Sequence, residues 1–245
     1  MNIHQSGSVK ISKGEYEEIK VSGSTKIEGP VRCQKLKASG SLRATGLLDC
    51  SGEIRASGSS KFDEVKSGDL KLSGASNAQG DVRVKGEVKQ SGALSVGGSL
   101  SAEIVDASGA LSVAGDLEAG TCKLSGSVEV GGLINANTLK VRMSNDSSAR
   151  AIGGETIAIG KSADSNNGSF VSAIKNLFSF GGTGGQFAVT ETIEGDDITL
   201  EFVTCPEVSG KVVRIGKGCQ IGRVNYQESL EISEDAQVGE QVKQG

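Results

Sequence analysis

Hydrophobic and polar residues alternate along this chain in short bursts, and the same bursts recur at a nearly constant interval. In residues 110–125, for example, apolar side chains stand at Leu111 and Val113, and again at Cys122 and Leu124. Alternation with a period of two is typical of a β-strand with one buried face. Most units contain three such bursts, which predicts three short strands in each unit.

Ser-Gly pairs mark the start of each unit. They end at glycines that are almost evenly spaced along the chain: Gly7, Gly23, Gly40, Gly58, Gly74, Gly92, Gly109 and Gly126. Glycine adopts a positive φ without strain, so each pair predicts a turn at a corner. A second set of glycines predicts another corner that tolerates positive φ: Gly29, Gly46, Gly80, Gly98, Gly115 and Gly132.

A fixed repeat of strands and turns predicts a solenoid, in which each unit bonds only to its neighbours. We therefore expect an all-β fold: a single-stranded β-helix with triangular rungs of about 17 residues. A β-sandwich is the alternative, because it is also built from short alternating strands.

The period divides the chain into three parts. Residues 1–159 form an N-terminal β-helix array, and residues 187–245 restore the period as C-terminal β-helix rungs. Residues 160–186 break it, and their flanks of Ser, Asn and Gly predict a flexible excursion. The centre of this excursion has apolar residues at helical spacing, which predicts a short amphipathic helix: Phe170, Val171, Ile174, Leu177 and Phe178.

Composition narrows the class of protein. Apolar residues make up 36% of the chain and aromatic residues 3%, which suits a narrow core. The net charge of −4 argues against non-specific nucleic-acid binding. No apolar run long enough to span a membrane and no signal-peptide core occurs in the sequence, so we expect a cytoplasmic protein.

Residue types needed for catalysis are sparse. His4 is the one histidine, and the nearest acidic pairs, Asp63-Glu64 and Asp196-Asp197, have no Trp or Tyr nearby to stack a sugar. The five cysteines lack C-x-x-C spacing and predict neither a zinc site nor a disulfide framework: Cys33, Cys50, Cys122, Cys205 and Cys219. We therefore expect no enzyme activity, no cofactor, no metal and no small-molecule substrate. A carbohydrate-active enzyme is the least favoured alternative.

Basic residues close seven of the eight units at the same point: Lys20, Lys37, Arg55, Lys71, Lys89, Lys123 and Lys140. Stacking the units would place them in one ladder. Acidic residues two positions earlier lie on the same face and would neutralise much of it: Glu18, Glu53, Asp69 and Glu87. A solvated edge is the simpler interpretation, and an anionic lipid or polymer bound to the ladder is the alternative.

The repeat of Ser-Gly followed by alternating hydrophobic residues, with rungs such as GKVVRIGKGCQIGRV (210–224), resembles the bactofilins, which are bacterial polymer-forming cytoskeletal proteins. The resemblance covers the two repeat arrays. It implies a right-handed β-helix that polymerises end to end without nucleotide, often at the inner face of the cell membrane. It also implies a scaffold for cell shape, polarity or motility.

The ends of a solenoid expose unpaired strand edges, which favour self-association. The candidate assembly residues are Val9, Ile11 and Ile19 at one end and Leu230, Ile232 and Val238 at the other. A second copy of the chain is thus the expected partner, and the inner membrane surface or a membrane protein is a further one. The alternative function is a capped β-helix module, which would recruit a protein or the membrane through the 170–178 helix or the basic ladder.

Overall fold

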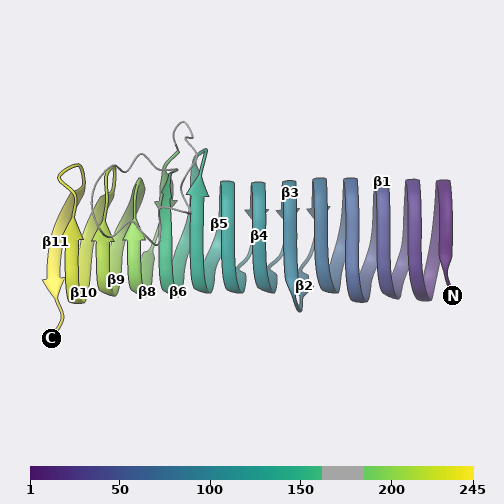
Figure 1. Cartoon of the computed structure of the whole chain (residues 1–245), viewed down its shortest axis with the longest axis horizontal. Helices are drawn as coiled ribbons and strands as arrows, with labels where there is room; N and C mark the ends of the chain where they lie inside the picture. The colour runs from purple at the N-terminus through teal and green to yellow at the C-terminus, as the bar shows by residue number, and fades with distance from the viewer. Residues whose placement is uncertain (162–184) are drawn as a thin grey trace. The chain divides into compact units, whose positions relative to one another are not determined.

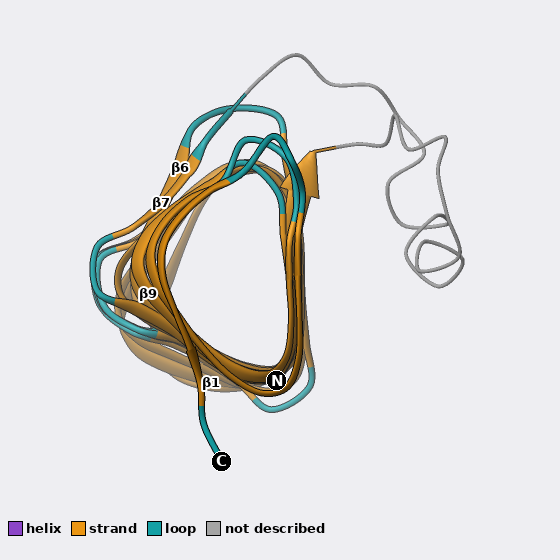
Figure 2. Ribbon diagram, turned by 90° about the vertical axis from the view of Figure 1, so that its left-hand side faces the viewer, coloured by secondary structure: helices purple, strands orange, loops and turns teal. Residues whose placement is uncertain are grey.

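The computed structural model describes residues 1–161 and 185–245, which divide into two compact units, residues 1–120 and 121–245. In each unit, parallel strands coil around three sides with turns at the corners (Figure 1 and Figure 2). No helix occurs in the described residues. The predicted all-β solenoid with a ~17-residue spacing is confirmed. The predicted helix at 170–178 lies outside the described residues.

The strands of unit 1 pair in parallel with an offset of one repeat. Gly74 of β1 lies opposite Gly92 of β3, and Gly92 lies opposite Gly109 of β4. The register therefore follows the Ser-Gly spacing. The strands are β1 (Ile3–Ala78), β2 (Val82–Val84), β3 (Glu87–Val96) and β4 (Leu100–Val113). The boundary between the two units falls within β5 (Leu117–Met143).

Unit 2 continues with β6 (Ser147–Lys161), β7 (Phe187–Val189), β8 (Thr192–Leu200), β9 (Val203–Ile215), β10 (Gln220–Ile232) and β11 (Gln237–Lys243). β6 pairs in parallel with β7 and β8, so that Ile152 lies opposite Ile193 and Ile157 opposite Ile198. The strands on either side of residues 162–184 are thus hydrogen-bonded neighbours. The C-terminal rungs stack directly on β6.

The Ser-Gly corners of unit 1 form a ladder of seven glycines, from Gly7 to Gly109, with φ between +90° and +112°. From the second member onward, a Cβ atom would meet the carbonyl oxygen of the ladder glycine in the preceding rung; at Gly23 the distance to the oxygen of Gly7 would be 2.5 Å. Backbone conformation and rung spacing therefore both require glycine here.

The second corner behaves differently from our expectation. Of its glycines only Gly29 (φ +80°) and Gly46 (φ +78°) use a positive φ. At Gly98 and Gly115 the lack of space requires glycine instead. A Cβ on Gly115 would lie 2.5 Å from Oγ of Ser99, and one on Gly98 would meet the carboxylate of Asp81.

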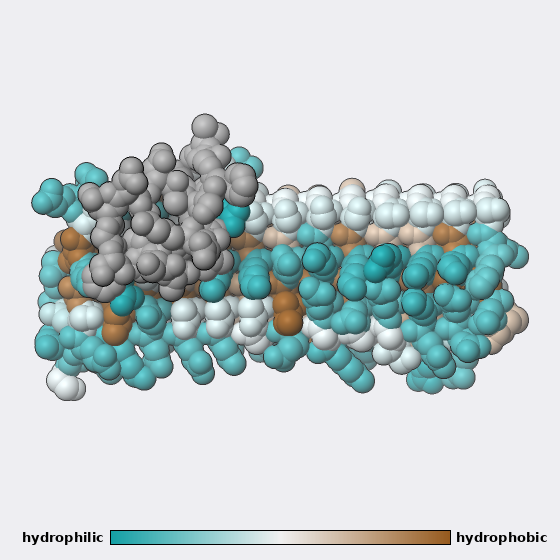
Figure 3. All heavy atoms as spheres, viewed as in Figure 1, coloured by the Kyte–Doolittle hydropathy of each residue, from teal (hydrophilic) through white to brown (hydrophobic). Residues whose placement is uncertain are grey.

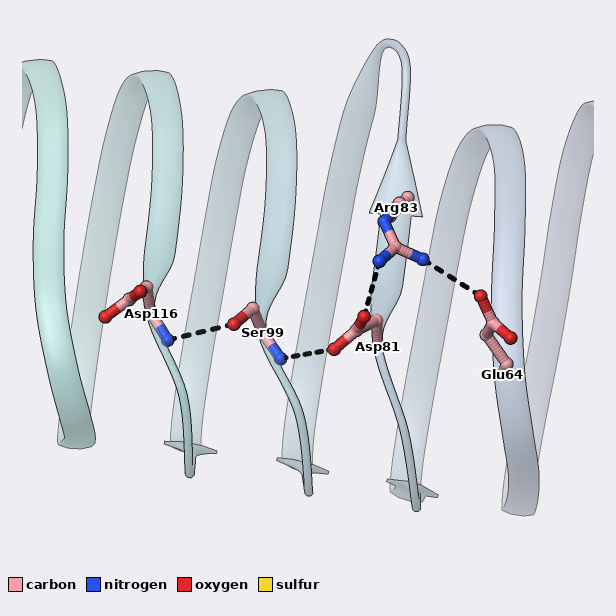
Figure 4. Close-up of polar contacts among 5 residues, drawn as sticks. All are labelled: Glu64, Asp81, Arg83, Ser99 and Asp116. Carbon is pink, nitrogen blue, oxygen red and sulfur yellow. Dashed lines mark hydrogen bonds and ion pairs between the residues drawn. The ribbon is translucent and has the colours of Figure 1, made fainter.

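Side chains at this second corner bond successive rungs to one another (Figure 4). The carboxylate of Asp81 accepts a hydrogen bond from the backbone N–H of Ser99 (2.9 Å), and the hydroxyl of Ser99 accepts one from the N–H of Asp116 (3.1 Å). Arg83 donates hydrogen bonds to both Asp81 and Glu64, and its Nη1 lies 2.9 Å from Oε1 of Glu64. Polar corner residues thus satisfy backbone donors where the strand ladder is interrupted.

One inward position of unit 1 carries an amide in place of an apolar side chain. Gln90 is 2% exposed and lies opposite Leu72 on one side and Ala107 on the other. Neither polar atom of its side chain has a hydrogen-bond partner in the described residues, and the hydroxyls of Ser67 and Ser76 are buried in the same way. A buried polar group left unpaired costs about 1–3 kcal/mol.

Replacing Gln90 with Met is therefore expected to raise the free energy of unfolding by about 1 kcal/mol, because the new side chain has a similar volume and no unpaired amide. Urea denaturation followed by circular dichroism measures the change. Gln79→Met, at an exposed position, is the control and should leave stability nearly unchanged. A loss of stability in Gln90→Met would show that the amide has a partner, such as a buried water molecule.

Candidate assembly surfaces at the chain ends

The C-terminal end of unit 2 presents an open strand edge. β11 pairs with β10 along one edge, where Val238 lies opposite Ile221. No strand in residues 1–161 and 185–245 pairs with its other edge. Unpaired N–H and C=O groups along a strand are a template for a further strand.

Apolar side chains at this end are only half-buried: Leu230, Ile232, Ala236, Val238 and Val242. Leu230 and Ile232 lie opposite Val213 and Ile215 of the preceding rung, which are at most 2% exposed. The same inward positions are therefore buried wherever another rung follows. A strand of a second molecule would complete their burial.

Sequence reasoning found Leu230, Ile232 and Val238 at this end but missed Val242. The signal for Val242 was weak, because the residue one repeat earlier is Asn225 and not an apolar residue. Asn225 is buried and donates hydrogen bonds to Glu207 Oε1 (2.6 Å) and Ser209 Oγ (3.1 Å). A polar residue at the equivalent position concealed the periodicity.

The three candidates near the N-terminus have a different environment. Val9 is 8% exposed, Ile11 is 2% exposed and Ile19 is fully buried. Their side chains thus belong to the core of unit 1. Any contact made by this end would use other groups.

Residues 1–4 form the outermost backbone beside these core residues. The N–H of Glu17 donates to the carbonyl oxygen of Met1 (3.0 Å), and the N–H of Glu18 donates to Oδ1 of Asn2 (3.1 Å). The hydroxyl of Tyr16 folds back and donates to the carbonyl oxygen of Ser12 (2.9 Å). These non-repeating residues satisfy part of the edge that the first rung would otherwise expose.

The acidic pairs considered as catalytic groups have structural partners. The carboxylate of Asp63 accepts a hydrogen bond from the N–H of Gly46 (2.8 Å). Asp196 pairs with Lys211 (3.0 Å) and Asp197 with Arg214 (2.7 Å). No group of three or more His, Cys, Asp or Glu in the described residues is arranged to hold a metal ion.

The five cysteines are free and buried. Burial raises the pKa of the Cys122 thiol to about 12, and that of Cys205 and Cys219 to about 11. Cys33 and Cys50 are hydrogen-bonded neighbours, and this contact together with burial raises the pKa of Cys33. The same contact lowers the pKa of Cys50. The four thiols with a raised pKa are poor nucleophiles, because the thiolate is the reactive form.

The candidate partner helix, Phe170, Val171, Ile174, Leu177 and Phe178, lies outside the described residues. In the described part of the chain, no helix has the length and apolar character that crossing a bilayer requires.

Comparison with known proteins adds one relative. The chain is 33% identical over 102 residues to YhbF of Bacillus subtilis (strain 168), described as an uncharacterized protein. The match covers 41% of this chain and 37% of YhbF, so the chain spans little more than a third of that relative. No family model matches the chain. No solved structure matches it either.

Proposed function

We propose that this chain is a non-enzymatic scaffold protein whose copies assemble end to end, without nucleotide, through the ends of the β-helix. The open edge of β11, with the half-buried residues Leu230, Ile232 and Val238 beside it, is the observation that carries the proposal. The resemblance to bactofilins supports it and implies an assembly in the bacterial cytoplasm or at the inner face of the cell membrane. There it would support cell shape, polarity or motility.

The physical basis is the incomplete last rung. A second molecule that pairs with β11 satisfies its backbone groups and covers the apolar side chains in one step. Burying the exposed half of a Leu or Ile side chain contributes about 1 kcal/mol. Because a solenoid has two ends, contacts of this kind propagate into a filament unless their geometry closes.

The double variant Leu230→Glu, Ile232→Glu is expected to weaken assembly at least ~30-fold, because it removes about 2 kcal/mol of apolar contact and places two carboxylates at the end. Sedimentation velocity at several concentrations and negative-stain electron microscopy measure the size and length of the assemblies. The wild-type chain should form filaments or sheets, and the variant should form short oligomers or monomers.

Glu231→Lys is the matched control, because this residue lies on the same strand with its side chain exposed. It changes charge at the same place and should leave assembly intact. Circular dichroism and thermal melting establish that each variant is folded. Filaments of unchanged length formed by a folded double variant would remove the C-terminal end from the proposal.

A capped β-helix that recruits a partner is the second candidate function. The burial of Val9, Ile11 and Ile19 favours it, because an N-terminal end at which these apolar side chains are buried offers less contact area for end-to-end growth. A wild-type chain that sediments as a monomer or dimer at every concentration would support this second function.

A further inference from the structure

Unit 1 carries a groove across successive rungs, next to the Ser-Gly corners. Two recesses, each of about 540 Å³, share Arg55 and Ser57 and so form one groove. Buried residues such as Val21 and Leu72 form its floor. Figure 3 shows this strip of hydrophobic colour over unit 1, between a row of small residues of near-neutral hydropathy and a row of hydrophilic side chains.

The two walls of the groove are chemically uniform. One wall consists of the basic residues Lys20, Lys37, Arg55, Lys71 and Lys89. The other consists of serines two positions later in each rung: Ser22, Ser39, Ser57, Ser73 and Ser91. Neighbouring strands lie about 4.8 Å apart, so five cations follow one another over about 19 Å. Both rows recur in the sequence, the serines as part of the Ser-Gly pairs, but only the structure shows that they line a recess.

Carboxylates beside the groove compensate its charge only in part. Glu53 Oε1 lies 3.1 Å from Arg55 Nη2 and 3.0 Å from Lys71 Nζ, and the hydrogen bond from Lys71 keeps the pKa of Glu53 below its usual value. Glu18 lies 4.0 Å from Lys20. Lys37, at the centre of the first recess, forms no ion pair with any residue that the structure describes.

The first recess is more strongly cationic than the second. It is lined by Lys20, Lys37 and Arg55 without a carboxylate, whereas Glu87 and Asp106 line the second. The charge of the whole unit follows the same gradient. Residues 1–61 carry ten Lys and Arg against six Asp and Glu, a net charge of +4, and residues 62–120 carry five against nine, a net charge of −4.

These walls offer hydrogen-bond donors and few free acceptors. Lys and Arg side chains donate only, and a serine hydroxyl both donates and accepts. The strand N–H and C=O groups below them are already bonded to neighbouring rungs. The complementary ligand is therefore linear, carries several negative charges and consists mainly of acceptors.

Chains of phosphate groups meet these requirements better than other polyanions. An acidic peptide would bring one backbone N–H group for every residue, and the walls offer few acceptors for them: the serine hydroxyls, and the carboxylates of Glu87 and Asp106 in the second recess. Nucleic acid bases would find no Phe, Tyr or Trp to stack on, and His4, the one ring that lines the groove, is hydrogen-bonded to Glu18 (3.1 Å). A flat lipid surface spreads its phosphates over a plane, whereas the cations of this groove follow one line. We propose that this groove binds a linear phosphate chain, phosphoanhydride or phosphodiester, with Lys37 at the centre of the site.

Binding of two phosphate polymers tests the proposal: inorganic polyphosphate and poly(glycerol phosphate). Poly-glutamate and vesicles containing phosphatidylglycerol serve as anionic probes of other classes. Isothermal titration calorimetry at several salt concentrations gives affinity and salt dependence. We expect tighter binding of at least one phosphate polymer than of poly-glutamate or vesicles, and the order of the two polymers identifies the source of the phosphate chain.

The groove variant is Lys20→Ser, Lys37→Ser, Arg55→Ser. It should bind the preferred phosphate polymer at least ~10-fold more weakly, and the slope of log K against log salt should fall by about 2–3. The matched control is Lys26→Ser, Arg43→Ser, Lys61→Ser, which removes the same charge from exposed positions of the same rungs outside the groove. Both sets contain residues that pair with a glutamate: Arg55 with Glu53 and Lys20 with Glu18 in the groove variant, and Lys26 with Glu28 in the control.

The control variant should keep its affinity within about threefold of the wild-type value, because it removes only long-range attraction. Equal weakening of the two folded variants would overturn the proposal, since binding would then follow net charge and not the groove. Absence of binding to both phosphate polymers, or tighter binding of poly-glutamate or vesicles, would overturn it as well.

Discussion

Replacing Gly58 with Ala is expected to destabilise unit 1 by about 3 kcal/mol or more, because two costs add at this position. The backbone φ of +102° is strained for any residue with a Cβ atom. The new Cβ would also collide with the carbonyl oxygen of Gly40 in the preceding rung. That oxygen belongs to a backbone held by hydrogen bonds on both sides, so it is unable to move without breaking them. Urea denaturation followed by circular dichroism measures the loss.

Gly7→Ala separates the two costs. Gly7 has a φ of +90°, but nothing lies within 4 Å of the position of a Cβ atom. Conformational strain alone should cost about 1–2 kcal/mol there. Equal losses at Gly7 and Gly58 would show that the approach of successive rungs contributes nothing. An unchanged free energy of unfolding in Gly58→Ala would contradict the conclusion that this position requires glycine.

Truncating Phe62 to Ala is expected to lower the free energy of unfolding by about 3–5 kcal/mol. This is the second large effect. Phe62 is 2% exposed, and the equivalent inward positions of the neighbouring rungs are Ala44 and Ala78, which are also buried. The aromatic ring therefore occupies space that two small residues leave free. Because each rung of a solenoid contacts only its neighbours, no distant side chain is available to fill the cavity. Thermal and urea denaturation measure the loss.

Two further variants test this account of the core around Phe62. Phe62→Leu keeps most of the volume and should cost less than about 1.5 kcal/mol. Adding Ala78→Leu to Phe62→Ala should restore part of the lost stability, because the larger side chain enters the same space. A loss below about 1 kcal/mol in Phe62→Ala would show that the rungs collapse to close the cavity.

The burial of the candidate assembly residues was predictable at one end of the chain only. Leu230 and Ile232 lie one repeat after Val213 and Ile215, so the pattern marks them as inward positions of a late rung. The burial of Ile11 was not predictable in this way. It depends on how the first rung packs in three dimensions, and residues 1–4, which do not follow the repeat, bond to Glu17 and Glu18 in that rung.

The groove on the side of unit 1 is a second feature that the sequence predicted only in part. Lys37 and Arg55 recur at one point of the repeat, and their alignment in a ladder follows from the sequence. Whether a ladder stands on a ridge or beside a recess depends on how the backbone bends at the adjacent Ser-Gly corner. Arg55 pairs with Glu53, whereas Lys37 forms no ion pair among the described residues. This difference depends on where the side chains of neighbouring rungs lie.

The sequence by itself determined the strands, the glycine corners and the parallel register. These follow from local stereochemistry, which recurs in every rung, and identical repeats stack most favourably in register. Only the tertiary structure decided which inward residues remain half-exposed, which corner glycines are required by contact and not by φ, and where cations line a recess. Each of these depends on atoms about one repeat or more away in the chain, and the shape and closure of a surface arise only when rungs lie side by side.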